Sequence, residues 1–161
     1  MKLLKYIADK SEPEKTDKKF AARAVLFDEN NLVPILFVSN FNYHKIPGGG
    51  IEKAETKLQG LHREIKEETG CLAKIGKEMG KVVEYRSKWN LLQTSYCYIG
   101  KVTQKGDPSF TDDEIREGFK LVWMTLDEAI TQLKKDKPAD YQGKFIQERD
   151  LAFLEAAKRL V

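Results

Sequence analysis

The sequence is poor in the two residue types that most often build crosslinks and soft metal sites. Among its 161 residues there are two cysteines, Cys71 and Cys97, and two histidines, His44 and His62. Two cysteines suggest no disulfide framework, and we interpret both as small core residues. Two histidines make a histidine-based zinc site a poor interpretation of this chain.

Long apolar runs are also absent. No stretch reaches the roughly 20 apolar residues that a membrane-spanning helix needs. Residues 1–10 lack the apolar stretch and cleavage site of a secretion signal, so we expect a cytoplasmic protein without a membrane partner. The formal net charge of +3 is too small to favour a nucleic-acid partner. The lysines between residues 10 and 19 are typical of a solvated linker.

The order of apolar segments predicts one domain, spanning residues 1–161, in the α/β (α+β) class. Such a chain is long enough to enclose a core, and its 41% of apolar residues is ordinary for a globular protein. We expect strands at residues 3–7, 20–27, 32–38, 81–85, 91–102 and 118–124, and helices at 57–69, 125–135 and 141–159. The second and third strands are typical of a hairpin. A mixed β-sheet with helices on both faces accommodates this order.

Residues 49–71 have the strongest local signals. Thr56 and Gln59 match a capping box at the start of a helix, and Gly70 suits the left-handed position that ends one. Leu58, Leu61 and Ile65 recur at helical spacing and predict an apolar stripe toward the core.

The same helix concentrates negative charge on one side. At about 100° per residue, Glu64, Glu67 and Glu68 fall within a single arc, where like charges repel. A hard divalent cation such as Mg²⁺ would turn these carboxylates into ligands. Gly48, in the preceding glycine run, would let backbone approach the same place. The alternative interpretation is a solvated, charge-rich helix, which the agreement of spacing, cap and glycines disfavours.

The segment resembles the Nudix box, G-x5-E-x7-R-E-U-x-E-E-x-G-U, where U is apolar. The matching residues are Gly49, Glu55, Arg63, Glu64, Ile65, Glu67, Glu68 and Gly70, and Cys71 stands where an aliphatic residue is commoner. The resemblance implies a Nudix α/β/α sandwich, with the box at residues 49–71 and residues 1–19 as an N-terminal extension. It also implies hydrolysis of a nucleoside diphosphate linked to another group, with Mg²⁺ or Mn²⁺ as cofactor.

Roles carry over from the family by position. Gly48, through its carbonyl, and Glu64, Glu67 and Glu68 are the implied metal ligands. Arg63 would orient the neighbouring glutamates, and Glu55 would support the junction between loop and helix. Glu64 is the first candidate for the general base. Glu114, in an acidic stretch where family members often supply an extra acid, is the second.

The substrate is less well defined by sequence. A small-molecule nucleotide is implied, and a MutT-like pyrophosphatase acting on nucleoside triphosphates, oxidised ones included, is the leading interpretation. Dinucleoside polyphosphates, ADP-ribose and RNA 5′ ends are alternatives, as is a non-catalytic nucleotide sensor or scaffold. Tyr43, Tyr85 and Trp89 are candidates to stack on a base. The resemblance also admits a homodimer, since many members are dimers.

Overall fold

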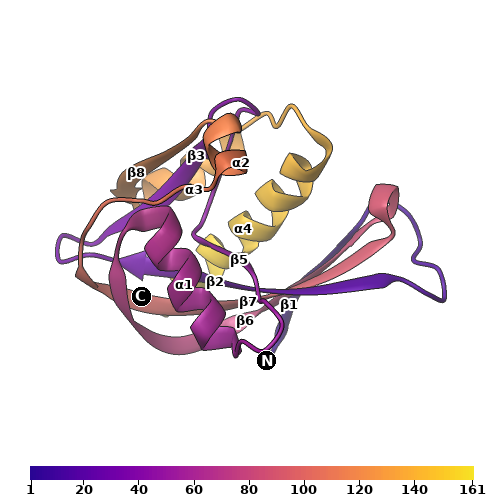
Figure 1. The fold of residues 1–161 in the computed structure, drawn as a ribbon, viewed down its shortest axis with the longest axis horizontal. Helices are drawn as coiled ribbons and strands as arrows, with labels where there is room; N and C mark the ends of the chain where they lie inside the picture. Colours follow the sequence, from indigo (N-terminus) through magenta and orange to yellow (C-terminus); the bar gives the residue numbers. More distant parts are fainter.

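Five strands build the larger of two sheets in the computed structural model, which describes residues 1–161 (Figure 1). Its order is β1-β6-β7-β2-β5, with β1 parallel to β6, β2 parallel to β7, and the other pairs antiparallel. The strands are β1 (Leu3–Ala8), β2 (Asp17–Phe27), β5 (Gly48–Gly50), β6 (Leu72–Arg86) and β7 (Leu91–Gln104). The sheet is therefore mixed, as the sequence predicts.

Three strands form a second, antiparallel sheet in the order β4-β3-β8. They are β3 (Leu32–Val38), β4 (Tyr43–Lys45) and β8 (Phe119–Thr125). The predicted hairpin of β2 and β3 is wrong in this respect. A tight turn does join the two strands, with the Asp28 amide donating to the Leu32 carbonyl at 2.9 Å. The strands then enter different sheets, because β7 and β5 pair with β2 while β4 and β8 pair with β3.

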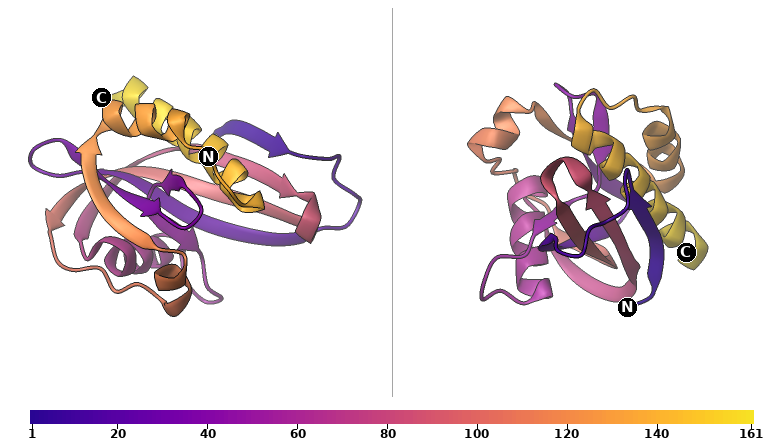
Figure 2. Two further views of the ribbon diagram at one scale, coloured as in Figure 1. Left: turned by 90° about the horizontal axis from the view of Figure 1, so that it is seen from above. Right: turned by 90° about the vertical axis from the view of Figure 1, so that its right-hand side faces the viewer.

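Helices cover both faces of the larger sheet (Figure 2). Helix α1 (Lys57–Thr69) lies on one face, and α3 (Leu126–Lys135) and α4 (Tyr141–Leu160) lie on the opposite side. Two short helices, η1 (Ser87–Trp89) and α2 (Asp112–Arg116), complete the fold. This arrangement confirms the predicted sandwich. None of the helices combines the length and apolar character needed to span a membrane.

Several segments differ from the expected boundaries. Strand β6 begins at Leu72 rather than near Lys81, and register shifts around Glu78 and Gly80 interrupt the alternation of its residues. Strands β4 and β5 and helix α2 were not expected. At the N-terminus β1 pairs with β6, and β2 begins at Asp17, so the segment expected as an extension contributes strands to the sheet.

A buried charge network connects the larger sheet to α4. Glu84 of β6 accepts hydrogen bonds from Arg86 Nε at 3.0 Å, from Arg149 Nη1 at 3.1 Å and from Gln93 Nε2 at 3.1 Å. Arg149 also donates from Nε to Asp150 at 2.7 Å. Burial alone would raise the pKa of Glu84, but the guanidinium groups of Arg149 and Arg86 hold it below its usual value. These contacts pair the charges of Glu84, Arg86, Arg149 and Asp150 where α4 packs on the sheet.

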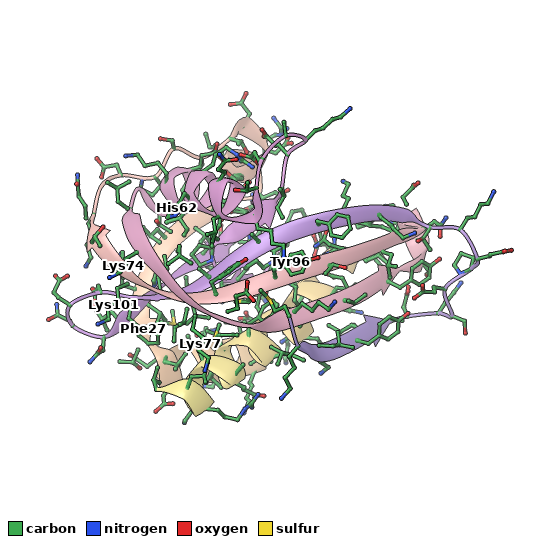
Figure 3. The ribbon with its side chains drawn as sticks, turned by 90° about the horizontal axis from the view of Figure 1, so that it is seen from below. Phe27, His62, Lys74, Lys77, Tyr96 and Lys101 are labelled. Atoms are coloured by element: carbon green, nitrogen blue, oxygen red, sulfur yellow. The ribbon has the colours of Figure 1, made fainter.

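The start of α1 is anchored on the opposite face. Lys57 Nζ lies 3.9 Å from the centroid of the Tyr96 ring, a cation–π contact between α1 and β7. Tyr96 lies along the central part of the sheet in Figure 3. Further along α1, Leu61 and Ile65 are buried against Ala22 and Ala24 of β2. Together these contacts fix how the acidic residues of the helix face the glycine run.

Candidate active site

Helix α1 has the ends that its sequence predicts. Thr56 accepts from the Gln59 amide at 3.1 Å, and Gln59 Oε1 accepts from the Thr56 amide at 2.9 Å, so the capping box is complete. Gly70 closes the helix with a φ of 72°. One detail was wrong: Leu58 is exposed, whereas Leu61 and Ile65 of the predicted apolar stripe are buried.

Arg63 organises the acids at the N-terminal half of the site. Its Nε and Nη2 atoms contact Glu55 at 2.7 and 3.0 Å, a bidentate pair, and Nη1 donates to Glu64 at 2.9 Å. Nη2 also donates to the Gly50 carbonyl at 3.0 Å. The hydrogen bonds from Arg63 lower the pKa of Glu55 to about 2. Arg63 thus ties the box helix to the glycine run and orients the Glu64 carboxylate.

The glycine run approaches too closely to carry side chains. A Cβ on Gly48, whose φ is 143°, would lie 2.4 Å from the Ala22 carbonyl oxygen. A Cβ on Gly49 would lie 2.6 Å from the carboxylate carbon of Glu64. Glycine is required at position 48, where the φ is positive and the obstacle is backbone, whereas a Cβ at position 49 would displace the Glu64 carboxylate.

Three buried carboxylates hold the main chain of residues 44–48, which we call the 44–48 segment. Each accepts a hydrogen bond from one backbone amide, and together they engage every second amide of the segment. His44 donates to Asp136 at 2.7 Å, Ile46 to Asp150 at 3.0 Å, and Gly48 to Glu68 at 2.8 Å. The acceptors come from the end of α3, from α4 and from α1. Sequence reasoning missed Asp136 and Asp150, because no local pattern signals a carboxylate that binds a distant amide.

Glu68 is the most enclosed acid of the box. Its carboxylate accepts from the Gly48 amide and from Lys45 Nζ, the latter at 3.1 Å. Burial raises its pKa to about 7, although Lys45 and the Gly48 amide act in the opposite direction.

Three carboxylates from two helices, α1 and α2, converge in this place. Oxygen atoms of Glu64, Glu68 and Glu114 all lie within 4.8 Å of one another. Glu114 belongs to α2, where it caps the helix with Thr111. Glu67 stands apart from this group, with 35% of its side chain exposed and a 3.6 Å contact to Arg63. The structure thus brings together Gly48, Glu64, Glu68 and Glu114, and leaves Glu67 at the rim.

Two of the three aromatic candidates do not present a ring to a ligand. Tyr43 is only 1% exposed and packs with Val38 and Ile146. Tyr85 is buried and donates its hydroxyl hydrogen bond to Asn90 at 3.0 Å. These two expectations are corrected: the Tyr43 ring is part of the core, and Tyr85 is held by its hydrogen bond to Asn90.

Trp89 remains exposed, with its edge on Tyr141 at 5.1 Å. It lies in η1, just before the start of β7 at Leu91. The position of β7 that is level with the glycine run is Cys97, because Cys97 pairs with Arg23 and Arg23 pairs with Gly48. The part of β7 between Leu91 and Cys97 spans about 20 Å at the rise of a strand. Trp89 is therefore at the far end of the sheet from the carboxylates.

Arg23 is a residue that sequence reasoning missed. It pairs with Gly48 across β2 and β5, is 5% exposed and forms no ion pair. Its one side-chain hydrogen bond runs from Nε to Ser95 Oγ at 3.3 Å. Burial, assisted by the charge of Arg149, lowers the pKa of Arg23 to about 10. A buried cation with free donors beside the acidic cluster has the chemistry to bind an anion.

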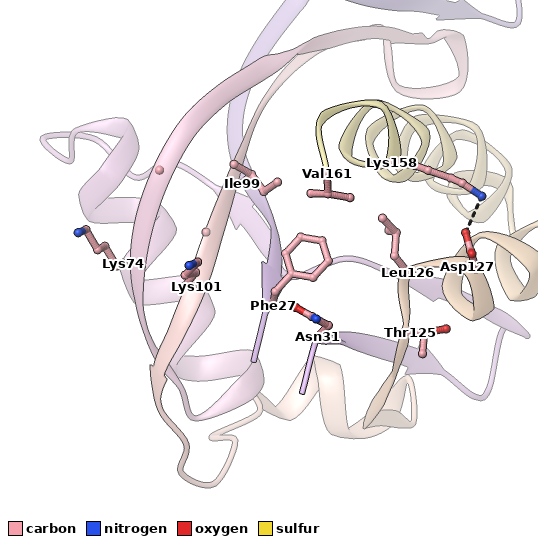
Figure 4. A pocket seen from close by; sticks show the side chains of 12 residues that line it. Phe27, Asn31, Lys74, Ile99, Lys101, Thr125, Leu126, Asp127, Lys158 and Val161 are labelled. Carbon is pink, nitrogen blue, oxygen red and sulfur yellow. Dashed lines mark hydrogen bonds and ion pairs between the residues drawn. The ribbon is translucent and has the colours of Figure 1, made fainter. Parts of the chain in front are cut away.

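A cavity of about 790 Å³ lies apart from this cluster (Figure 4). Its apolar lining residues are Phe27, Ile99, Leu126 and Val161. Lys158 is paired with Asp127 at 2.6 Å, and the amine of Lys74 points away from the cavity. None of its lining residues belongs to the glycine run or to α1.

Comparison with known proteins agrees with this geometry. A family model described as NUDIX domain matches residues 17–159. The human diphosphoinositol polyphosphate phosphohydrolase 3-beta is 28% identical over 138 residues, covering 83% of this chain and 80% of that protein. The chain belongs to the Nudix family, and it is a Nudix hydrolase.

Two solved structures share the fold. The MutT protein from Methanosarcina mazei Go1 superposes with a TM-score of 0.61 at 17% identity, covering 92% of this chain and 98% of that one. An ADP-ribose pyrophosphatase from Streptococcus suis has a TM-score of 0.54 at 19% identity, covering 87% and 92%. At such identities these similarities establish the fold alone.

Proposed function

We propose that this chain hydrolyses a diphosphate bond in a small phosphorylated substrate, with Mg²⁺ or Mn²⁺ as cofactor. The observation that carries the proposal is the convergence of Glu64, Glu68 and Glu114 within 4.8 Å. Three carboxylates at this separation repel one another unless protons or a cation intervene. Their oxygens, with the Gly48 carbonyl, are the hard donors that such a metal prefers. The residues present therefore fit the metal that Nudix hydrolases generally use.

The metal would be held by Gly48, Glu64 and Glu68, with Glu67 joining from the rim. When bound, it would supply charge neutralisation for the phosphates and a lower pKa for the attacking water. Arg63 holds Glu64 in place through the 2.9 Å hydrogen bond, so that Glu64 faces Gly49. Glu64 is our first candidate to accept the proton of the water, and Glu114 is the second.

Arg23 would bind the substrate rather than take part in the proton transfer. Its Nε donates to Ser95 Oγ, and the remaining guanidinium donors match phosphate oxygens. A buried arginine of this kind fixes the position of a phosphate group relative to the carboxylates.

Among substrates we place nucleoside triphosphates first, oxidised guanine nucleotides included, because this is the leading interpretation of the sequence. A second candidate class is diphosphoinositol polyphosphates. It is supported by the relatives that are 28% identical to this chain, which are named for hydrolysis of these compounds. ADP-ribose is a third, through the structural similarity to the pyrophosphatase from Streptococcus suis.

The test is a panel of phosphate-release assays with Mg²⁺ and with Mn²⁺. It covers ordinary and oxidised nucleoside triphosphates, ADP-ribose, dinucleoside polyphosphates and diphosphoinositol polyphosphates. Glu64→Gln removes the central carboxylate, and Glu78→Gln, an exposed glutamate on β6, is the matched control. We expect one class to be cleaved, with turnover reduced about 100-fold or more in Glu64→Gln and unchanged in Glu78→Gln.

The same assay tests the remaining acids. Glu67→Gln and Glu68→Gln are expected to lower turnover by orders of magnitude, with little change in the fold. Full activity in both variants would overturn the assignment of metal ligands. Absence of cleavage across the panel, combined with tight binding of one of its compounds, would favour a nucleotide sensor.

A further inference from the structure

The ammonium group of Lys45 lies between two oxygens that the proposed function assigns to the metal. Lys45 Nζ is 3.1 Å from Glu68 Oε2 and 3.3 Å from the Gly48 carbonyl oxygen. Lys45 is on β4, three residues before Gly48, so its side chain folds back over its own segment. The two oxygens belong to different elements, β5 and α1, and the ammonium connects them.

The position of this lysine is enclosed. Only 11% of its side chain is exposed, and the Phe119 ring lies 5.5 Å from Nζ. Glu68 and Gly48 provide its only hydrogen bonds. A buried ammonium is costly unless it is paired, so the two oxygens hold it firmly in place.

We propose that Lys45 is a tethered cation that competes with the divalent metal for Glu68 and the Gly48 carbonyl. The inference rests on the proposed function, since it assumes that the metal binds these oxygens. An ammonium and a divalent cation cannot occupy the same two oxygens, because both are positive and their centres would coincide. Metal binding therefore requires the Lys45 side chain to rotate away, and the free energy of its contacts is subtracted from the affinity for the metal.

Lys45 also stabilises the site before a metal binds, because it pairs with the buried Glu68 carboxylate. Glu68 is fully buried, and a carboxylate without a positive partner is unfavourable in such a position. While Lys45 is in place, Glu68 and the Gly48 carbonyl keep the separation that their shared hydrogen bonds define. Lys45 thus keeps the ligands assembled until a metal takes over the same contacts. The concentration of divalent cation needed to load the site is set by this exchange.

The first experiment measures Mn²⁺ binding without substrate, by calorimetry and by the electron paramagnetic resonance signal of free Mn²⁺. It compares the parent protein with Lys45→Met, which removes the ammonium and keeps the aliphatic length. Lys45→Arg keeps the charge. Lys134→Met is the matched control, since Lys134 has only an exposed ion pair with Glu155. Hydrogen bonds to charged groups correspond to about a tenfold change or more in a binding constant.

We therefore expect Lys45→Met to bind Mn²⁺ about tenfold more tightly than the parent. Lys45→Arg and Lys134→Met should bind with the affinity of the parent. Equal affinities of Lys45→Met and Lys134→Met would overturn the proposal for Lys45 while leaving the metal site intact. A parent protein that binds no Mn²⁺ would instead remove the metal site itself, and the proposed function with it.

A second measurement uses the parent protein alone and does not depend on the folding of a variant. Brief acylation with an amine-reactive reagent, followed by mass spectrometry of peptides, reports how accessible each lysine is. We expect saturating Mg²⁺ to increase the acylation rate of Lys45 several-fold, while Lys134 stays constant. A Lys45 rate that is unchanged or reduced by Mg²⁺ would contradict displacement of the ammonium.

Discussion

Replacing Glu84 by glutamine would remove the negative charge from the centre of the buried network between the larger sheet and α4. In the parent, both carboxylate oxygens are engaged: Arg149 and Gln93 donate to one, and Arg86 donates to the other. A glutamine keeps one acceptor oxygen and places an amide nitrogen where the second oxygen was. One of the two arginines then faces a donor, and the buried charge is no longer balanced.

The magnitude follows from the burial of the partners. Glu84 and Arg149 are both within 1% of full burial in their side chains. Removing one member of a buried ion pair costs about 3–5 kcal/mol of unfolding free energy. For a chain of this size, 1 kcal/mol corresponds to about 2–4 °C in the melting temperature, so Glu84→Gln should melt about 6–20 °C below the parent.

The effect should depend on pH in a defined direction. The pKa of Glu84 is lowered in the folded state, so its charge stabilises the fold at pH values above the unfolded pKa of about 4.3. That contribution is lost as the pH falls through the folded pKa. The difference in stability between parent and Glu84→Gln should therefore be full at pH 7 and should shrink as the pH is lowered below about 4.

Thermal and urea unfolding, followed by circular dichroism, measure both effects. Glu155→Gln is the control, because its ion pair with Lys134 spans 3.7 Å between exposed side chains and should contribute about 1 kcal/mol or less. If Glu84→Gln melted within 2 °C of the parent at pH 7, the reasoning about buried charge in this protein would be refuted.

Three further predictions concern the site and its supports. Gly48→Ala should destabilise the fold by about 1–3 kcal/mol and reduce turnover, since the φ of Gly48 is 143° and the Ala22 carbonyl blocks a Cβ. Urea unfolding and steady-state kinetics measure the two effects, and a variant with the stability and turnover of the parent would contradict the prediction. Thr56→Ala should cost about 1 kcal/mol through loss of the N-cap, lowering the melting temperature by about 2–4 °C in calorimetry; an unchanged temperature would contradict the role of the cap. Arg23→Met should raise KM about tenfold or more with a smaller change in kcat, because it removes donors to a substrate phosphate. Steady-state kinetics on the cleaved substrate measure both constants, and an unchanged KM would disprove phosphate binding by Arg23.

Local features of the site could be predicted from the sequence, because their causes lie within a few residues. The Thr56 capping box and the Gly70 terminus each depend on neighbours in one helix. The convergence of Glu64 and Glu68 follows from helical spacing, and Glu114 was found through the acidic stretch that carries it.

Features that depend on distant partners could not be predicted. The separation of β2 and β3 into two sheets is decided by β7 and β8, which follow much later in the chain. Tyr43 lies in loop-like sequence, yet Ile146 of α4 buries it. Arg23 has the pattern of an ordinary strand residue, and only its register with Gly48 places it beside the carboxylates.

The 44–48 segment is held at three points through its main chain. Asp136, Asp150 and Glu68 accept hydrogen bonds from main-chain amides, which every amino acid except proline possesses. These three hydrogen bonds to the main chain of the segment therefore do not depend on which side chain stands at position 45. A substitution at position 45, by mutagenesis or in evolution, can therefore change how tightly the site binds cations and phosphates. The three main-chain hydrogen bonds of the segment would remain.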